Sequence, residues 1–256
     1  MGLASIKAVP SLVEHPVASE AHVLYCFDVL SAHLQGAEPS APCFDVTGKC
    51  ALFVSWHRTG GQLRGCIGSL RPLPFSECFR NYALTSALRD RRFAPITQHE
   101  LPDLKCTVQL LGCFEPCAHL TDWDPSGVHG VTISFLDENG TTRSAIYLPD
   151  VMPGQGWGHY QAIDSLIRKS GYSLAITDTL RKRLEVQRFT STKCSLHYEH
   201  WARIRCGGSQ HGTKAMPVPT YAQPYQLNYG IGNSALKQCD QGLMPSHTDR
   251  PPVQPQ

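Results

Sequence analysis

The stretch CALFVSWHRTGGQLRGCIGSL, residues 50–70, decides which fold class is expected for this chain. It holds two runs typical of strands, CALFVSWH and QLRGCIGSL, separated by RTGG. Gly60 and Gly61 suit the positive φ angles of a tight turn, so the stretch predicts an antiparallel β-hairpin. Strands that arrive as hairpins favour an α+β fold over a doubly wound parallel sheet.

The other predicted elements repeat this pattern. Apolar residues at helical spacing predict three helices, over 20–34, 75–90 and 159–171. Strand-like runs cover 104–112, 183–189 and 194–201, and a second hairpin over 131–148 turns at Asn139-Gly140. Because helices fall between antiparallel strand pairs, we expect helices packed on antiparallel sheet.

The 256 residues are predicted to contain one folded unit between two flexible ends. Residues 1–18 are expected to be a flexible N-terminus, and residues 19–205 the folded domain. Residues 206–256 are predicted to be a disordered tail, because the last fifty residues hold seven of the nineteen prolines and show no sustained periodicity.

Charge and hydropathy argue against nucleic-acid and membrane partners, and cysteine usage indicates the redox compartment. The net charge of +2 gives no whole-chain argument for a nucleic-acid partner, because phosphate binding needs clustered basic surface. No apolar run is long enough to span a bilayer, and the N-terminus does not resemble a secretory signal, so no membrane partner is expected. Eleven cysteines at scattered spacing are expected to be reduced thiols in an intracellular protein.

Cys66 is the first candidate for chemistry. Arg64 lies two residues away, so on a regular strand both side chains point to one face, and the guanidinium would stabilise a thiolate. Gly65 and Gly68 would let a ligand approach the backbone. A buried cysteine on a core strand, with glycines at a bulge, explains the same residues, so both interpretations stay open.

A second candidate group is the RDRRF segment that follows the helix predicted over 75–90. Arginines there would hold a carboxylate or phosphate through two parallel hydrogen bonds. Alternatively, they complement the helix dipole, and Asp90 pairs with one of them.

Three further side chains carry weaker signals. Asp164 and Arg168 lie four apart on one helical face, which by default predicts a surface ion pair. His129, which lies between Gly127 and Gly130 ahead of a strand, is either a base or an ordinary loop residue.

No metal or cofactor is predicted. Cys113, Cys117 and His119 would supply part of a zinc site, but the remaining candidates (Cys194, His197 and His200) have irregular spacing. The phosphate-cradling, dinucleotide, nucleophile-elbow and HExxH signatures are absent from the sequence.

Eight segments, in order, resemble the AMMECR family, which is named after a candidate gene for a human syndrome. They are YCFDVLSAHL, LFVSW, LRGCIGSL, YALTSALRDRRFAPIT, ELPDLKC, GVHGVTISF, AIYLPDV and AIDSLIRKSGY. The resemblance covers about residues 20–205. It implies an α+β fold with a larger and a smaller lobe around antiparallel sheets, and an intracellular protein, nuclear in animals. Bacterial members are often linked to proteins of the Memo and radical-SAM types.

The resemblance also implies a functional cleft at the RGCIG segment. The residues implied for it are Arg64, Gly65, Cys66, Ile67, Gly68, Asp90, Arg92 and Phe93, with less weight on His129, Asp164 and Arg168. Arg91 departs from the family pattern and adds positive charge beside this cleft.

Two functions of different class fit these observations, and whether the protein is an enzyme is left open. In the first, a Cys66 thiolate, supported by Arg64 and His129, acts on a small anionic substrate. In the second, a nuclear adaptor or regulatory protein binds an anionic group or a partner's peptide between Arg64 and Arg92, and Cys66 is structural. Nucleic-acid binding is disfavoured, because no aromatic-basic motif is present.

Overall fold

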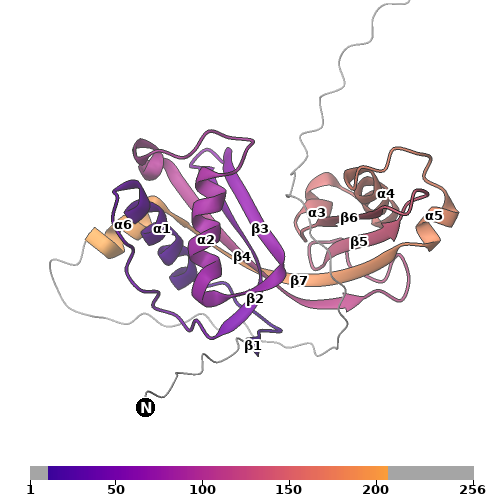
Figure 1. Ribbon diagram of the computed structural model, residues 1–256, viewed down its shortest axis with the longest axis horizontal. Helices are drawn as coiled ribbons and strands as arrows, with labels where there is room; N and C mark the ends of the chain where they lie inside the picture. Colours follow the sequence, from indigo (N-terminus) through magenta and orange to yellow (C-terminus); the bar gives the residue numbers. More distant parts are fainter. Residues whose placement is uncertain (1–10, 207–256) are drawn as a thin grey trace, which may run out of the picture.

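One seven-stranded sheet runs through both lobes of the computed structural model, which describes residues 11–206 (Figure 1). The strand order is β1-β2-β4-β7-β5-β6, and β3 pairs with β2. The strands are β1 (Ser11–Leu12), β2 (Gly48–Arg58), β3 (Leu63–Pro74), β4 (Leu104–Pro116), β5 (Gly130–Leu136), β6 (Thr142–Tyr147) and β7 (Glu185–His197). All pairs are antiparallel except β1 with β2, so the predicted α+β class is confirmed.

The helices divide between the two lobes (Figure 1). The larger lobe carries α1 (Glu20–Leu34), α2 (Phe75–Leu88), the 3₁₀ helix η1 (Gln98–Asp103) and α6 (Tyr198–Cys206). The smaller lobe carries α3 (Val151–Gln155), α4 (His159–Lys169) and α5 (Asp178–Lys182). None of the helices in residues 11–206 is long and apolar enough to cross a membrane.

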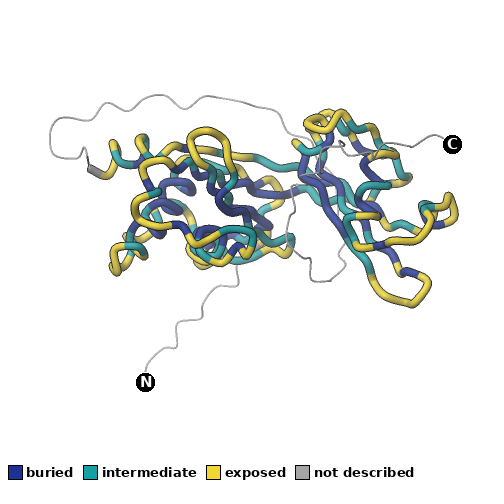
Figure 2. The backbone as a smooth tube through the Cα atoms, turned by 90° about the horizontal axis from the view of Figure 1, so that it is seen from above, coloured by how far each residue is buried: buried dark blue, intermediate teal, exposed yellow. Residues whose placement is uncertain are grey.

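The core of the larger lobe lies between α1, α2 and one face of the sheet. Alternate residues of β2, such as Val54 and Trp56, point to this face and are fully buried. The Trp56 indole Nε1–H donates to the Ala83 carbonyl at 3.2 Å and to Ser86 Oγ at 3.0 Å. These bonds fix α2 on β2. In Figure 2 the buried backbone, in dark blue, lies mainly inside the lobes, and the exposed backbone, in yellow, lies mainly at their periphery.

The core of the smaller lobe forms where α4 covers the β5–β6 hairpin. Ala162, Ile163, Leu166 and Ile167 recur at helical spacing and are all 0% exposed. Gly140 adopts φ +73° in the connecting turn, where its N–H donates to the Asp137 carbonyl, so the turn expected at Asn139-Gly140 is confirmed. In the β2–β3 turn, Gly61 has a positive φ of +86°.

A third apolar cluster joins the two lobes, and we name it the interlobe cluster. It contains Ala51, Phe53, Cys66, Leu111, Ile146, Leu148 and Phe189. Its members come from β2, β3 and β4 of the larger lobe, from β6 and the residue after it, and from β7. Cys66 of β3 is therefore a member of an apolar cluster to which both lobes contribute.

The C-terminal part of the domain differs from the prediction. The two strands expected at 183–189 and 194–201 are one continuous strand, β7, which pairs with β4 and β5. Residues 198–201 belong to α6 and not to a strand. The reason is tertiary packing: Trp201 stacks on Phe27 at 6.0 Å, and its indole N–H donates to Asp28 Oδ1 at 2.8 Å.

The first described residues lie against the domain. Ser11 and Leu12 pair with Gly48 and Lys49, and the Ala18 N–H donates to Thr192 Oγ1 at 2.8 Å. The domain boundaries at residues 18 and 205 stay predictions. The tail predicted over 206–256 lies outside the described residues from residue 207 onward.

Candidate functional site

Gly65 and Gly68 fit their neighbours too closely to carry a side chain. A Cβ on Gly65 would lie 1.8 Å from the Ser86 carbonyl oxygen of α2. A Cβ on Gly68 would lie 2.2 Å from Cδ1 of the Phe53 ring. Both distances are below the 3.0 Å that real Cβ contacts respect. The two glycines therefore let β3 pack against α2 and beside Phe53, and this role needs no ligand.

Arg64 is the extra residue of a β-bulge. β3 pairs Gly65 with Trp56 and Leu63 with His57, so Arg64 lies between two paired residues of β3 whose partners in β2 are adjacent in sequence. Such a bulge interrupts the alternation of faces along a strand.

The bulge separates the side chains of Arg64 and Cys66. The Arg64 guanidinium contacts Glu100 and the Ala94 carbonyl, whereas Cys66 packs in the interlobe cluster and is 5% exposed. The expectation that a regular strand places Arg64 and Cys66 on one face is therefore wrong, because the strand is not regular at this point.

Side chains close the outer edge of β3 at Cys66. Within residues 11–206, β3 pairs with no strand but β2. The Cys66 N–H donates to Asp90 Oδ2 at 2.9 Å, and the Cys66 carbonyl accepts from Arg92 Nη2 at 3.2 Å. Asp90 and Arg92 thus take the place that a neighbouring strand would occupy.

Asp90 is ionised in the folded protein. Its side chain is buried, and Arg92 donates to it through Nε (3.0 Å to Oδ1) and Nη2 (2.8 Å to Oδ2). Burial opposes ionisation, but the hydrogen bonds from Arg92 and from the Cys66 N–H outweigh it and hold the pKa of Asp90 below its ordinary value. The pair is therefore a fixed, charge-assisted clamp.

A second carboxylate, Glu100, organises the arginines on the other side. Arg64 donates to it through Nε (2.7 Å to Oε2) and Nη2 (3.0 Å to Oε1), and Arg58 Nη2 donates at 3.1 Å. The Thr97 N–H also donates to Glu100, which completes a capping box at the start of η1. Chiefly because of the Arg64 hydrogen bonds, the pKa of Glu100 falls from 4.5 to about 2.

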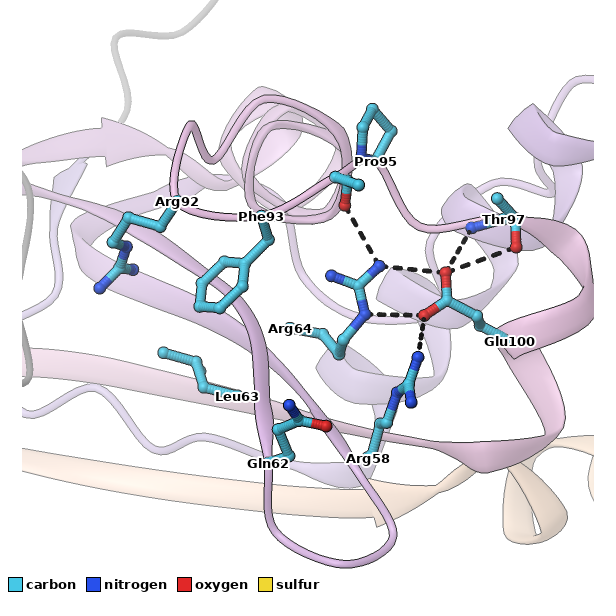
Figure 3. Close-up of a pocket in the computed structure, with 10 residues that line it drawn as sticks. Arg58, Gln62, Leu63, Arg64, Arg92, Phe93, Pro95, Thr97 and Glu100 are labelled. Atoms are coloured by element: carbon cyan, nitrogen blue, oxygen red, sulfur yellow. Dashed lines mark hydrogen bonds and ion pairs between the residues drawn. The ribbon is translucent and has the colours of Figure 1, made fainter.

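These groups line a pocket of about 500 Å³ between the tip of the β2–β3 hairpin and the loop before η1 (Figure 3). The charged wall consists of Arg58, Arg64, Arg92 and Glu100. The apolar wall consists of Leu63, Phe93, Ala94 and Pro95. Gln62 and Thr97 complete the lining. Arg58, Arg64 and Arg92 carry three positive charges, and Glu100 together with Asp90, which pairs with Arg92, carries two negative charges, so the group keeps one positive charge and suits an anionic ligand.

The pocket brings together three of the residues that the sequence predicted, Arg64, Arg92 and Phe93. Asp90 holds Arg92 from behind. Gly65, Cys66, Ile67 and Gly68 are not among the lining residues.

The other three predicted residues belong to the smaller lobe. His129 Nδ1 accepts the Asp124 N–H at 2.9 Å, and burial, with Arg188 nearby, lowers the pKa of the imidazole. Asp164 pairs with Arg181 at 2.8 Å, and not with Arg168.

Arg168 instead donates to the carbonyls of Tyr172 and Leu174, at 3.1 and 2.6 Å. It fastens the chain that leaves α4, which explains why the expected ion pair with Asp164 does not form.

The pocket also contains residues that the sequence did not single out, chiefly Arg58 and Glu100. A local signal existed for Glu100, because Thr97 and Glu100 have the spacing of a capping box. Arg58 carried no such signal. Within residues 11–206, no three His, Cys, Asp or Glu side chains converge as a metal site would require.

The AMMECR1 family profile matches residues 23–194, so this chain belongs to the AMMECR1 family. An uncharacterised protein of Arabidopsis thaliana is 44% identical over 189 residues, which cover 72% of this chain and 87% of that protein. An uncharacterised protein of Saccharomyces cerevisiae is 33% identical over 227 residues, covering 74% and 90% respectively.

A solved structure shows the same fold. The crystal structure of an uncharacterised protein from Pyrococcus horikoshii superimposes with a TM-score of 0.57 and 24% sequence identity. The match covers 70% of this chain and 93% of that protein. At this identity the likeness establishes the fold alone.

Proposed function

We propose that this AMMECR1-family protein binds a small anionic molecule, or the anionic group of a peptide, in the pocket beside the RGCIG segment. The observation that carries the proposal is a pocket in which Arg58 and Arg64 both bind Glu100, while Arg92, paired with Asp90, lines the same pocket. An oxyanion gains from several guanidinium donors held in fixed positions.

Within this pocket the arginines have different roles. The Arg64 side chain is 9% exposed, and its contacts with Glu100 and Ala94 fix the loop. The Arg58 side chain is 45% exposed and makes one hydrogen bond to Glu100, so it has N–H donors to offer a ligand. Arg58 is therefore the primary ligand contact in this proposal, and Arg64 is a positioning residue.

The burial of Cys66 favours the non-enzymatic form of this function, an adaptor or regulatory protein in which Cys66 is structural. Cys66 is a buried member of the interlobe cluster, and the Arg92 guanidinium donates to the Cys66 carbonyl and to Asp90. A nucleophilic thiol needs a cation or base beside its sulfur and access for its substrate. With an exposure of 5%, Cys66 does not have the access to solvent that a nucleophilic role would favour.

An intracellular location, in the nucleus or the cytoplasm, belongs to the same proposal. It is supported by the cysteines, since none of the nine whose side chains the structure describes forms a disulfide with another described cysteine. Free thiols on this scale are typical of reducing compartments.

The experiment that tests the proposal is an NMR titration of ¹⁵N-labelled protein with sodium phosphate at constant ionic strength. We expect saturable shifts of the Leu63 and Phe93 amide signals. Arg58→Ala should weaken phosphate binding about tenfold, because it removes a charge-assisted hydrogen bond.

A matched control is Arg80→Ala. Arg80 is also 45% exposed and also paired with a glutamate, Glu38, but it does not line the pocket. It should keep the wild-type affinity. An absence of saturable shifts, or equal loss of binding in both variants, would contradict the proposal.

A further inference from the structure

Phe93 is an aromatic side chain that contributes to no core. It belongs to none of the three hydrophobic clusters, although Ile96, three residues later, is buried in the largest of them. A phenylalanine usually contributes its large apolar surface to a core. Its half-buried position in the pocket therefore needs another explanation.

The position of Phe93 is fixed by its own turn. Its N–H donates to the Asp90 carbonyl at 3.0 Å, and the Arg92 guanidinium carbon lies 5.4 Å from the ring centroid. In the view of Figure 3 the ring lies between Arg92 and Arg64, above Leu63. The Asp90–Arg92 clamp thus holds an aromatic ring beside the guanidinium groups of the pocket.

The pocket consequently offers two kinds of contact side by side. Phe93 and Leu63 form an apolar surface, and Arg58 supplies donors for an oxyanion. The volume of about 500 Å³ lies within the range of small-molecule sites, roughly 300–1,000 Å³. A compact inorganic anion would use the donors and leave the apolar wall uncovered.

We infer that the ligand is an oxyanion, phosphate or carboxylate, attached to an aromatic ring. The oxyanion binds Arg58, and the ring packs against Phe93 and Leu63. Phe93 is then the residue that sets specificity, because it separates aromatic from compact anions. This inference rests on the proposed function, since it assumes that the pocket binds anions.

The test compares matched probes by the NMR titration described above: inorganic phosphate with phenyl phosphate, and acetate with benzoate. Wild-type protein should bind each aromatic probe about tenfold more tightly than its compact partner, because stacking and apolar burial add to the same ionic contact. Phe93→Ala should bring each ratio close to one. Phe93→Leu, which keeps an apolar side chain, should retain part of the ratio.

Tyr160→Ala is the matched control, because Tyr160 is 60% exposed on α4 and does not line the pocket. It should keep the wild-type ratio. Equal affinities for phenyl phosphate and phosphate in the wild type, or a ratio that survives in Phe93→Ala, would overturn the inference while the anion site stands. Absence of saturable shifts with all four probes would instead contradict the anion site itself.

Discussion

Gly65→Ala should strongly destabilise the domain, because the added methyl group meets the backbone of α2. The new Cβ would lie 1.8 Å from the Ser86 carbonyl oxygen and 2.9 Å from its carbonyl carbon. Backbone atoms in a helix cannot turn aside as the end of a flexible side chain can, so β3 and α2 must move apart.

Two contributions set the size of the effect. Overpacking of this kind costs about 1–3 kcal/mol. Separation of the two elements also disturbs the 3.0 Å bond from Trp56 Nε1 to Ser86 Oγ, which is worth about 1 kcal/mol. We expect the free energy of unfolding to fall by about 3 kcal/mol and the midpoint of thermal unfolding by roughly 6–12 °C.

The assay is urea unfolding followed by tryptophan fluorescence, with Gly60→Ala as the control. Gly60 belongs to the same hairpin, but a Cβ there would meet nothing within 4 Å, so its variant should stay within about 0.5 kcal/mol of wild type. If Gly65→Ala were as stable as Gly60→Ala, the packing explanation would be refuted. That result would favour the alternative explanation, in which Gly65 lets a ligand approach the backbone.

Two further predictions concern Glu100 and Cys66. The folded-state pKa of Glu100, about 2, lies below its ordinary value of 4.5, so Glu100 stabilises the fold above pH 4.5 and this stability is lost as the pH falls toward 2. In Glu100→Gln, the loss of unfolding free energy on acidification from pH 4.5 toward 2 should be smaller than in the wild type by roughly 2 kcal/mol. Glu38→Gln is the control, because its carboxylate is 80% exposed, and it should lose as much unfolding free energy as the wild type. Equal losses in all three proteins would contradict the argument. N-ethylmaleimide should label the exposed Cys43 more than about 100-fold faster than Cys66, as followed by peptide mass spectrometry, and similar rates would show that Cys66 is accessible after all.

The hairpins and the three long helices could be predicted because their signals are local. Apolar spacing and turn glycines mark the β2–β3 hairpin, the β5–β6 turn and α4 within a few residues of sequence. β7 and α6 could not be predicted in this way. β7 is continuous because it pairs with strands of both lobes, and Trp201 is helical because of contacts with α1 that lie far away in sequence.

The residues of the candidate site also fall into those that the sequence could predict and those that depend on tertiary structure. Arg64, Arg92 and Phe93 could be named from family resemblance, and the structure brings them to one pocket. Arg58 could not, because its place in the pocket depends on the register of the β2–β3 hairpin. Cys66 is buried in a cluster that also includes apolar residues of the smaller lobe, and no local pattern in the sequence indicates that cluster.

The RGCIG and RDRRF segments are best understood as one structural unit that shapes the pocket. The bulge at Arg64 turns its guanidinium to Glu100, which also binds Arg58. The Asp90–Arg92 clamp closes the edge of β3 and starts the turn that holds Phe93. In the proposed function, most residues of the two segments would therefore act on a ligand only through the few that reach the pocket. It follows that Asp90 should affect ligand affinity only to the extent that it affects the position of Arg92 and Phe93.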